Sequence, residues 1–407
     1  MAASAQDCTT QISLKRCLDQ MLKQTLKQTL AGLSRVLPGR KAVAVLVEPT
    51  IQPATLKILH RAANTFSGTG GIKFSVLSRQ LSTTGLRALY LRYGALLVTG
   101  GYRDTVTLLP IRLLPVAAVD PLLDPMAMWG WHNVIEALSP CTPARLKESR
   151  TTFGVLIRGL VSVGLSKCYI FGTGPSLNKA ADMDFKDGYR IICNTICKDR
   201  DLVRKLQPHI LVAGDALYHF SDTKHAKAFL TDVELRMEEC NFAFCYPAIF
   251  DAFVTNRLAR FKDRLIPIPY GKRFDLTVDM MQNFTLPNTG NVLGLLLLPI
   301  GCQLAKEIWM LGFDGRNSTD KLFWTNSTQH SYPEFVEEMR VEYPAFYNHF
   351  VPSDKPRAYV ESVHGDALDQ AMTIAEQNGW SFTLLSPSTS PALAKRRVAY
   401  RGIESAI

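Results

Sequence analysis

The chain has 407 residues, of which 47% are apolar and 20% charged, and its formal net charge is +10. This composition is that of an ordinary globular protein, and the length predicts two domains. The longest apolar stretch, Val292–Ile300, falls short of the roughly 18 residues that a membrane-spanning helix needs. The first residues lack the basic and apolar regions of a signal peptide.

The nine cysteines are odd in number and form no CxxC pair. They predict reduced thiols in a cytoplasmic protein and no zinc site. The excess of positive charge favours anionic partners such as nucleic acid, acidic lipid or anionic substrates. No nucleic-acid-binding motif accompanies this charge, so we expect no nucleic-acid partner. A peripheral position at the inner membrane surface stays open.

Residues 1–40 are expected to contain one amphipathic helix. Within residues 12–37, leucines recur every three or four positions, which is the helical period. Lysines and arginines give the other face a positive charge. This helix would either bind a membrane surface or a second copy of the chain, or simply cover its own domain.

Residues 41–150 are predicted to form a small accessory α/β domain. Strands are expected at Ala42–Val47, Ile72–Leu77 and Ala95–Val98, with a helix at Pro53–Ala63. Alternating strands and helices imply a parallel sheet. The turns carry no GxGxxG and no Asp-x-Asp metal motif, so acceptor binding, oligomerisation, a degenerate nucleotide-sugar fold and a purely structural role all remain open.

Residues 165–400 are predicted to form the main, Rossmann-like α/β domain with a parallel sheet. Its first strand, Cys168–Phe171, ends at the turn Gly172-Thr173-Gly174-Pro175-Ser176. Glycines let the backbone approach a ligand closely, and a strand–glycine turn–helix at the carboxyl edge of an open sheet is a usual nucleotide site. Since the full dinucleotide fingerprint is absent, an ordinary strand-ending turn is the alternative.

Later strands end in polar or small residues in the same way. Asn194 follows the strand ending at Cys193, Asp215 follows the strand His209–Ala213, and Gly312-Phe313-Asp314 follows Glu307–Leu311. Parallel strands bring such ends to one edge of a sheet, although Asn194 and Asp215 could also be turn caps. Asn288-Thr289-Gly290 is expected to cap a helix that runs through Leu304.

This ordered set resembles glycosyltransferase family forty-two, the bacterial CMP-sialic acid-dependent sialyltransferases, and the related motility-accessory-factor glycosyltransferases. The matching pieces are Gly172–Leu177, Asn194, Asp215, Asn288-Thr289-Gly290, Gly312–Asp314, His364 with Asp369, and Ser386-Pro387-Ser388. They cover roughly residues 165–395. The chain departs from the family at Gly315-Arg316, where the family has an aromatic phosphate-binding residue, and at Thr289, where it has Ser.

The resemblance implies a sialyltransferase-like variant of the GT-A fold and a nucleotide-sugar donor bound along the strand ends. The implied donor-binding residues are Gly172, Thr173, Gly174, Pro175, Ser176, Asn194, Asp215, Asn288, Thr289, Gly290, Gly312, Asp314 and Ser388. Arg316 would replace the aromatic contact to the leaving phosphate. The resemblance also makes His364 the general base, oriented by Asp369; an unperturbed pKa of about 6.5 suits that role.

Residues 316–359 are expected to be a long irregular loop and a lid over the site. Its Trp324, His330 and Tyr332 are acceptor-side candidates, with His330 also the reserve base or a phosphate ligand. The alternative is that these aromatic residues anchor the loop to the body.

The function favoured by these features is transfer of a sialic-acid-like sugar from a CMP donor to a glycan, lipid-linked saccharide or protein hydroxyl. No cofactor or metal would be required. One alternative is an archaeal-type 6-hydroxymethylpterin diphosphokinase, in which Asp215 and Asp314 would serve ATP and Mg²⁺. A second alternative is a non-catalytic scaffold of glycan assembly. A homo-oligomer remains open.

Overall fold

The computed structural model describes residues 41–78, 80–102, 114–272, 276–315, 329–350 and 365–399. The predicted helix in residues 1–40 lies outside these ranges, and so do three predicted site residues, Arg316, Trp324 and His364. The chain divides into two compact units. Residues 1–120 and 129–140 form the first unit, and residues 121–128 and 141–407 form the second. Among the described residues, no helix is long and apolar enough to cross a membrane.

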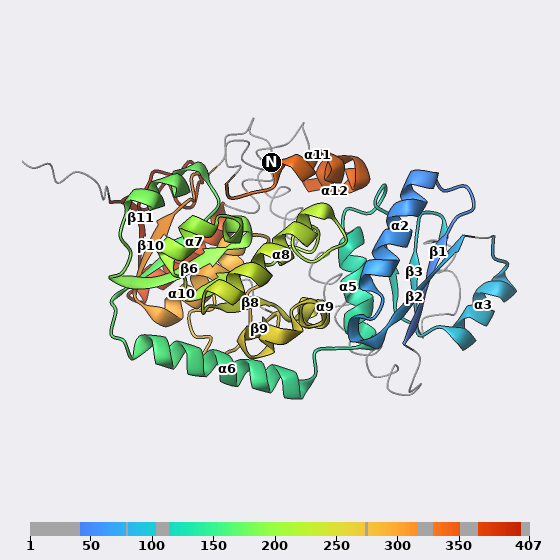
Figure 1. Ribbon diagram of the computed structural model, residues 1–407, viewed down its shortest axis with the longest axis horizontal. Coiled ribbons are helices and arrows are strands. Elements are labelled where there is room, and N and C mark those ends of the chain that lie inside the picture. Colours follow the sequence, from blue (N-terminus) through green and yellow to red (C-terminus); the bar gives the residue numbers. More distant parts are fainter. Residues whose placement is uncertain are drawn as a thin grey trace, which may run out of the picture. The chain divides into compact units, whose positions relative to one another are not determined.

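The first unit is an α/β unit whose four described strands are all parallel, in the order β2-β1-β3-β4 (Figure 1). Its core strands β1 and β3 are buried almost throughout because helices pack on the sheet. The strands are β1 (Ala42–Val47), β2 (Lys73–Ser78), β3 (Ala95–Val98) and β4 (Val116–Ala118), and the helices are α2 (Pro53–Phe66), α3 (Thr83–Arg92) and α5 (Ala127–Leu138). The predicted parallel sheet is confirmed.

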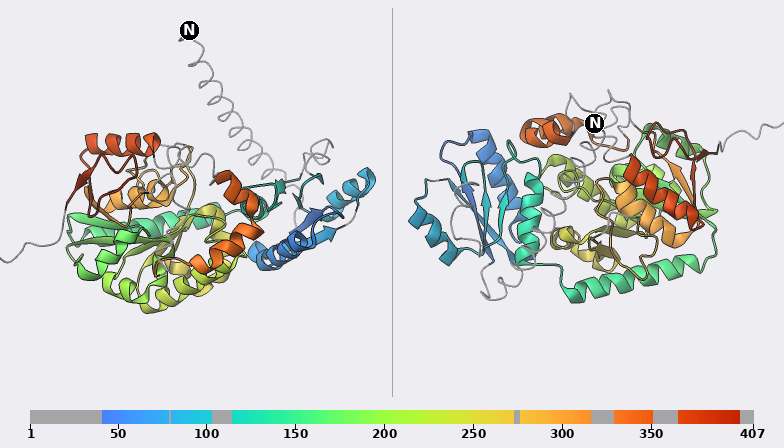
Figure 2. Two further views of the ribbon diagram at one scale, coloured as in Figure 1. Left: turned by 90° about the horizontal axis from the view of Figure 1, so that it is seen from above. Right: turned by 180° about the vertical axis from the view of Figure 1, so that it is seen from behind.

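The second unit contains a sheet of eight described strands, all parallel, in the order β12-β11-β10-β5-β6-β7-β8-β9. Helices flank it on both faces, as Figure 2 shows. The strands are β5 (Lys167–Phe171), β6 (Gly188–Cys193), β7 (Ile210–Val212), β8 (Ala243–Pro247), β9 (Leu265–Ile268), β10 (Glu307–Leu311), β11 (Ser381–Leu384) and β12 (Arg397–Val398).

In chain order, the described α-helices of this unit are α6 (Pro143–Val161), α7 (Arg200–Leu206), α8 (Lys224–Glu239), α9 (Asp251–Arg257), α10 (Leu298–Leu304), α11 (Pro333–Glu342), α12 (Pro344–Phe350) and α14 (Asp366–Gln377). Helix α6 belongs to the sheet of the second unit, because the Ser149 hydroxyl donates to Pro267 O (2.7 Å) and Arg145 to Leu265 O (2.9 Å). The domain boundary therefore lies near residue 141.

Two local predictions were wrong. The helix ending at Leu304 begins with a wide π-turn at Leu293–Leu297, and its capping side chain is Asn291, whose Oδ1 accepts from Gly294 N at 2.7 Å. Asn288 is exposed and Thr289 lies before the cap. Within the stretch expected to be irregular, residues 333–350 form α11 and α12, because Pro333 and Pro344 each start a helix.

Candidate functional site

The larger sheet reverses its strand order between β5 and β10. From β5 the chain adds β6 to β9 on one side and then returns to place β10 to β12 on the other. In open parallel sheets, ligands bind in the crevice outside the carboxyl ends of the strands at this reversal point. The two turns that meet there, Gly172–Ser176 and Gly312–Asp314, are the ones singled out from the sequence.

These two turns are hydrogen-bonded directly to each other. The amide of Gly174 donates to Gly312 O (2.9 Å), and the amide of Gly312 donates to the Ser176 hydroxyl oxygen (3.1 Å). Asp314 Oδ2 accepts from both the amide and the hydroxyl of Ser176, at 3.1 and 3.0 Å. A side chain at Gly174 would place its Cβ within 2.7 Å of Gly312 O, so this glycine is required by the contact between the turns.

The turn after β11 joins the same edge. Thr389 donates its amide to Asp314 O at 2.7 Å, and Ser388 accepts from the amide of Ser390 at 3.1 Å. Gly315 has a φ of +79°, and a Cβ there would collide with the backbone around Thr389. The reversal of strand order thus brings Ser388 beside the Gly312–Asp314 turn. The order of these residues in the sequence did not by itself predict this contact.

Asn194, the first residue after β6, has two features that point to a ligand. Its φ is +51°, a left-handed conformation that is uncommon outside glycine and that asparagine adopts more readily than most residues. Its side-chain oxygen is shielded from solvent, and no donor among the described residues reaches it. A buried acceptor left without a partner costs free energy, typically about 1–3 kcal/mol. An acceptor in this state, at a strand end next to the reversal point, is typical of a group that binds a ligand.

Asp215, after β7, is partly committed to its own turn. Its Oδ1 accepts from the amide of Tyr218 (2.7 Å), and its own amide donates to Nδ1 of buried His219 (3.1 Å). Burial raises the pKa of the Asp215 carboxyl, while the amides of Tyr218 and Leu217 oppose that rise. The hydroxyl of Tyr347 lies close enough for Asp215 to help raise its pKa to about 12, although burial is the main cause.

Asp215 and Asp314 do not form a common metal site. They follow β7 and β10, and β6 and β5 lie between these strands. Three strand spacings separate them by roughly 14 Å, whereas carboxylates that share one cation lie within about 5 Å of each other through bonds of 2.0–2.6 Å. No group of three potential metal ligands occurs among the described residues.

Segment 329–350, which carries α11 and α12, is docked on the strand ends by polar contacts. His330 is buried, and its Nε2 lies 3.1 Å from Asp199 Oδ2, while Thr195 Oγ1 donates to His330 O at 2.5 Å. Burial lowers the pKa of His330, and Asp199 partly offsets this effect. The hydroxyl of buried Tyr332 donates to Asp232 Oδ2 at 2.5 Å. Both acceptor-side candidates therefore anchor this segment to the body.

Asp369 is engaged by two cations of the segment before β12. Its carboxylate pairs with Lys395 at 2.5 Å and with Arg396. The hydrogen bond from Lys395 is the main cause of the lowered pKa of Asp369, and Arg396 adds to it. The carboxylate is thus committed to the segment before β12.

Comparisons with protein-family models, with curated proteins and with solved structures gave no match for this chain. The class that the fold defines is an α/β protein with Rossmann-like parallel sheets.

Proposed function

We propose that the second unit is a glycosyltransferase that moves a sialic-acid-like sugar from a CMP donor to a hydroxyl of a glycan, lipid-linked saccharide or protein. The observation that carries this proposal is Asn194: a residue with positive φ whose buried side-chain oxygen meets no donor among the described residues, beside the reversal point of a parallel sheet. A hydroxyl of the sugar or ribose would supply the missing donor. The order of the strand-end residues, taken with their resemblance to family forty-two, selects the donor class.

The reaction would need no metal if the protein stabilises the leaving group. The acceptor hydroxyl oxygen attacks the anomeric carbon, the bond from that carbon to the phosphate oxygen breaks, and CMP leaves as a phosphate monoester. Arg316 would stabilise the leaving phosphate with two charge-assisted hydrogen bonds. His364 would take the proton of the hydroxyl, and a general base of this kind typically contributes about a hundred- to ten-thousand-fold in rate.

The separation of Asp215 from Asp314 disfavours the pterin diphosphokinase alternative, since these were the two carboxylates that sequence offered for Mg²⁺. A donor screen distinguishes the classes directly. CMP should raise the melting temperature of the full chain, and ATP with Mg²⁺ should not. The reverse pattern would replace the proposal with the kinase.

The assignment of the base is tested by two histidine variants. His364→Ala should keep CMP affinity and lose transfer, together with the acid limb of the pH–rate profile. His330→Ala should lower stability, because His330 is 1% exposed and bound to Asp199. Transfer that survives in His364→Ala but not in equally folded His330→Ala would contradict the assignment.

A further inference from the structure

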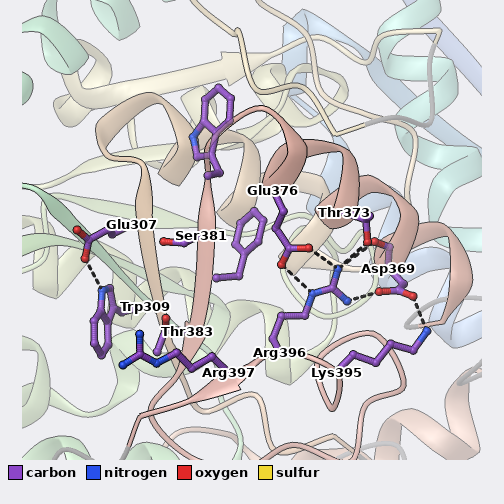
Figure 3. Close-up of a pocket in the computed structure, with 12 residues that line it drawn as sticks. Glu307, Trp309, Asp369, Thr373, Glu376, Ser381, Thr383, Lys395, Arg396 and Arg397 are labelled. Atoms are coloured by element: carbon purple, nitrogen blue, oxygen red, sulfur yellow. Dashed lines mark hydrogen bonds and ion pairs between the residues drawn. The ribbon is translucent and has the colours of Figure 1, made fainter.

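A hollow of about 710 Å³ lies beside β11, and it begins at Glu307 and Ser381, the first residues of β10 and β11. None of the residues that line it belongs to the turns Gly172–Ser176 and Gly312–Asp314. Beside it, the described pairing of β12 with β11 is short, at Thr383 and Leu384. Figure 3 shows that its lining residues project to both sides of β11.

On the side of the hollow formed by α14, the charged side chains pair with one another. Arg396, 8% exposed, contacts Asp369 and also places its Nε 3.2 Å from Glu376 Oε1. It donates as well to the Thr373 hydroxyl at 3.1 Å, and Lys395 pairs with Asp369. These groups fasten the segment before β12 to α14 and leave little for a ligand.

The other side is a flat row of side chains on one sheet face. Trp309, Thr383 and Arg397 are register partners on β10, β11 and β12, and Glu307 and Ser381 form the preceding row (Figure 3). Helix α10 covers the opposite face, since a methyl at Gly301 would lie 3.5 Å from Ile308. Thr383, 6% exposed, is the floor between the longer side chains.

The charged side chains of this row, Glu307 and Arg397, stand on separate strands. Arg397 is exposed, and no carboxylate pairs with it in the part of the chain that the structure describes. Glu307 accepts a long hydrogen bond from Trp309 Nε1, at 3.4 Å, and its register partner on β5 is Lys167. Two strand spacings, about 10 Å, separate the strands that carry Glu307 and Arg397. The Trp309 ring stands on the same strand as Glu307, with Lys167 Nζ 5.2 Å from its centroid, and Lys167 itself pairs with Asp187 at 2.9 Å.

We propose that this row, Glu307, Trp309, Ser381 and Arg397, binds an acidic saccharide at a second site, distinct from the strand-end crevice. The ring of Trp309 offers an apolar surface for the C–H face of a pyranose. The guanidinium of Arg397 matches a sugar carboxylate bidentately, and Glu307 and Ser381 accept from or donate to its hydroxyls. The Glu307 carboxylate disfavours a polyphosphate or nucleic acid at the same place.

The proposal is tested by calorimetric titration of the full chain with trigalacturonate and with its trimethyl ester. Loss of a charge-assisted bidentate contact should lower the affinity of Arg397→Gln for trigalacturonate by on the order of tenfold to a hundredfold. Trp309→Phe should weaken binding severalfold. Lys395→Gln is the matched control, because its cation lies in the same hollow but is paired with Asp369, and it should stay within about twofold of wild type.

The ester should bind wild type as weakly as trigalacturonate binds Arg397→Gln. Equal affinity of wild type and Arg397→Gln would overturn the proposal. So would equally tight binding of triglutamate or pyrophosphate, which would show a peptide or general anion site. CMP titrations of the same variants should be unchanged, so that this site and the proposed donor site succeed or fail separately.

Discussion

Ser176 and Asp314 join two strand-end turns that are 138 residues apart in the chain: the amide and the hydroxyl of Ser176 both donate to Asp314 Oδ2, at 3.1 and 3.0 Å. The same hydroxyl oxygen accepts from the amide of Gly312. One small side chain therefore satisfies a carboxylate and a buried amide at the point where the sheet reverses its strand order.

Ser176→Ala should lower the free energy of unfolding by about 1–3 kcal/mol, because it leaves the Gly312 amide without its acceptor and Asp314 Oδ2 with one donor fewer. Urea denaturation followed by circular dichroism measures this change. Ser162→Ala is the control, since its hydroxyl only donates to Gly159 O at an exposed helix end. Equal stability of Ser176→Ala and wild type would mean that the contact between the turns carries no stability.

Gly174→Ala should destabilise the fold even without a ligand, since its Cβ would lie within 2.7 Å of Gly312 O. Gly159→Ala is the matched control: it lies inside α6, and nothing lies within 4 Å of the added methyl. There alanine should stabilise by about 0.5–1 kcal/mol, the usual gain within a helix. A neutral Gly174→Ala would contradict the close packing of the two turns.

Stability should fall between pH 7 and pH 5 because of buried histidines. Burial lowers the pKa of His225 to about 4, below its unfolded value of about 6.5. The unfolded chain then binds the proton first, so this contribution is complete above pH 6.5 and is lost as the pH falls toward 4. The loss from His225 alone is about 2 kcal/mol at pH 5.

His225→Asn removes this titration and can retain the hydrogen bond that Nδ1 makes with Tyr218 O at 2.8 Å. The difference in unfolding free energy between pH 7 and pH 5 should therefore be smaller in this variant than in wild type. An unchanged difference would show that His225 does not contribute to the pH dependence.

Transfer activity should survive EDTA, because Asp215 and Asp314 stand on strands too far apart to share a cation. The measurement is turnover of a CMP donor with and without chelator. Activity that EDTA abolishes and Mg²⁺ or Mn²⁺ restores would require a different chemistry.

The sequence was sufficient for the main features of the sheet, because buried parallel strands appear as short apolar runs. The strands around Ile170, Val45 and Met310 were predicted within one or two residues. β8 was not predicted: its five residues, AFCYP, follow α8 closely and combine small residues with a proline. Periodicity cannot identify so short a run.

The site was less predictable than the sheet, since its key properties arise from tertiary contacts. Sequence placed Asn194 at a strand end, but it could show neither its positive φ nor the isolation of its Oδ1. It also could not show that Asp369 pairs with Arg396, because the two meet only through the packing of α14 against the segment before β12. The anchoring of His330 by Asp199 likewise depends on a contact across 131 residues.

The central claim, that the strand-end crevice binds a CMP-sugar through Asn194, is tested most directly by calorimetric titration of Asn194→Gly. Glycine accepts the φ of +51° and removes the side chain that carries the amide. The variant should be as stable as wild type, yet bind CMP-N-acetylneuraminic acid about tenfold or more weakly. Asn178→Ala, which changes an exposed asparagine just after the turn Gly172–Ser176, should bind like wild type. Equal affinity in wild type and Asn194→Gly, or no binding of CMP compounds to wild type, would contradict the account.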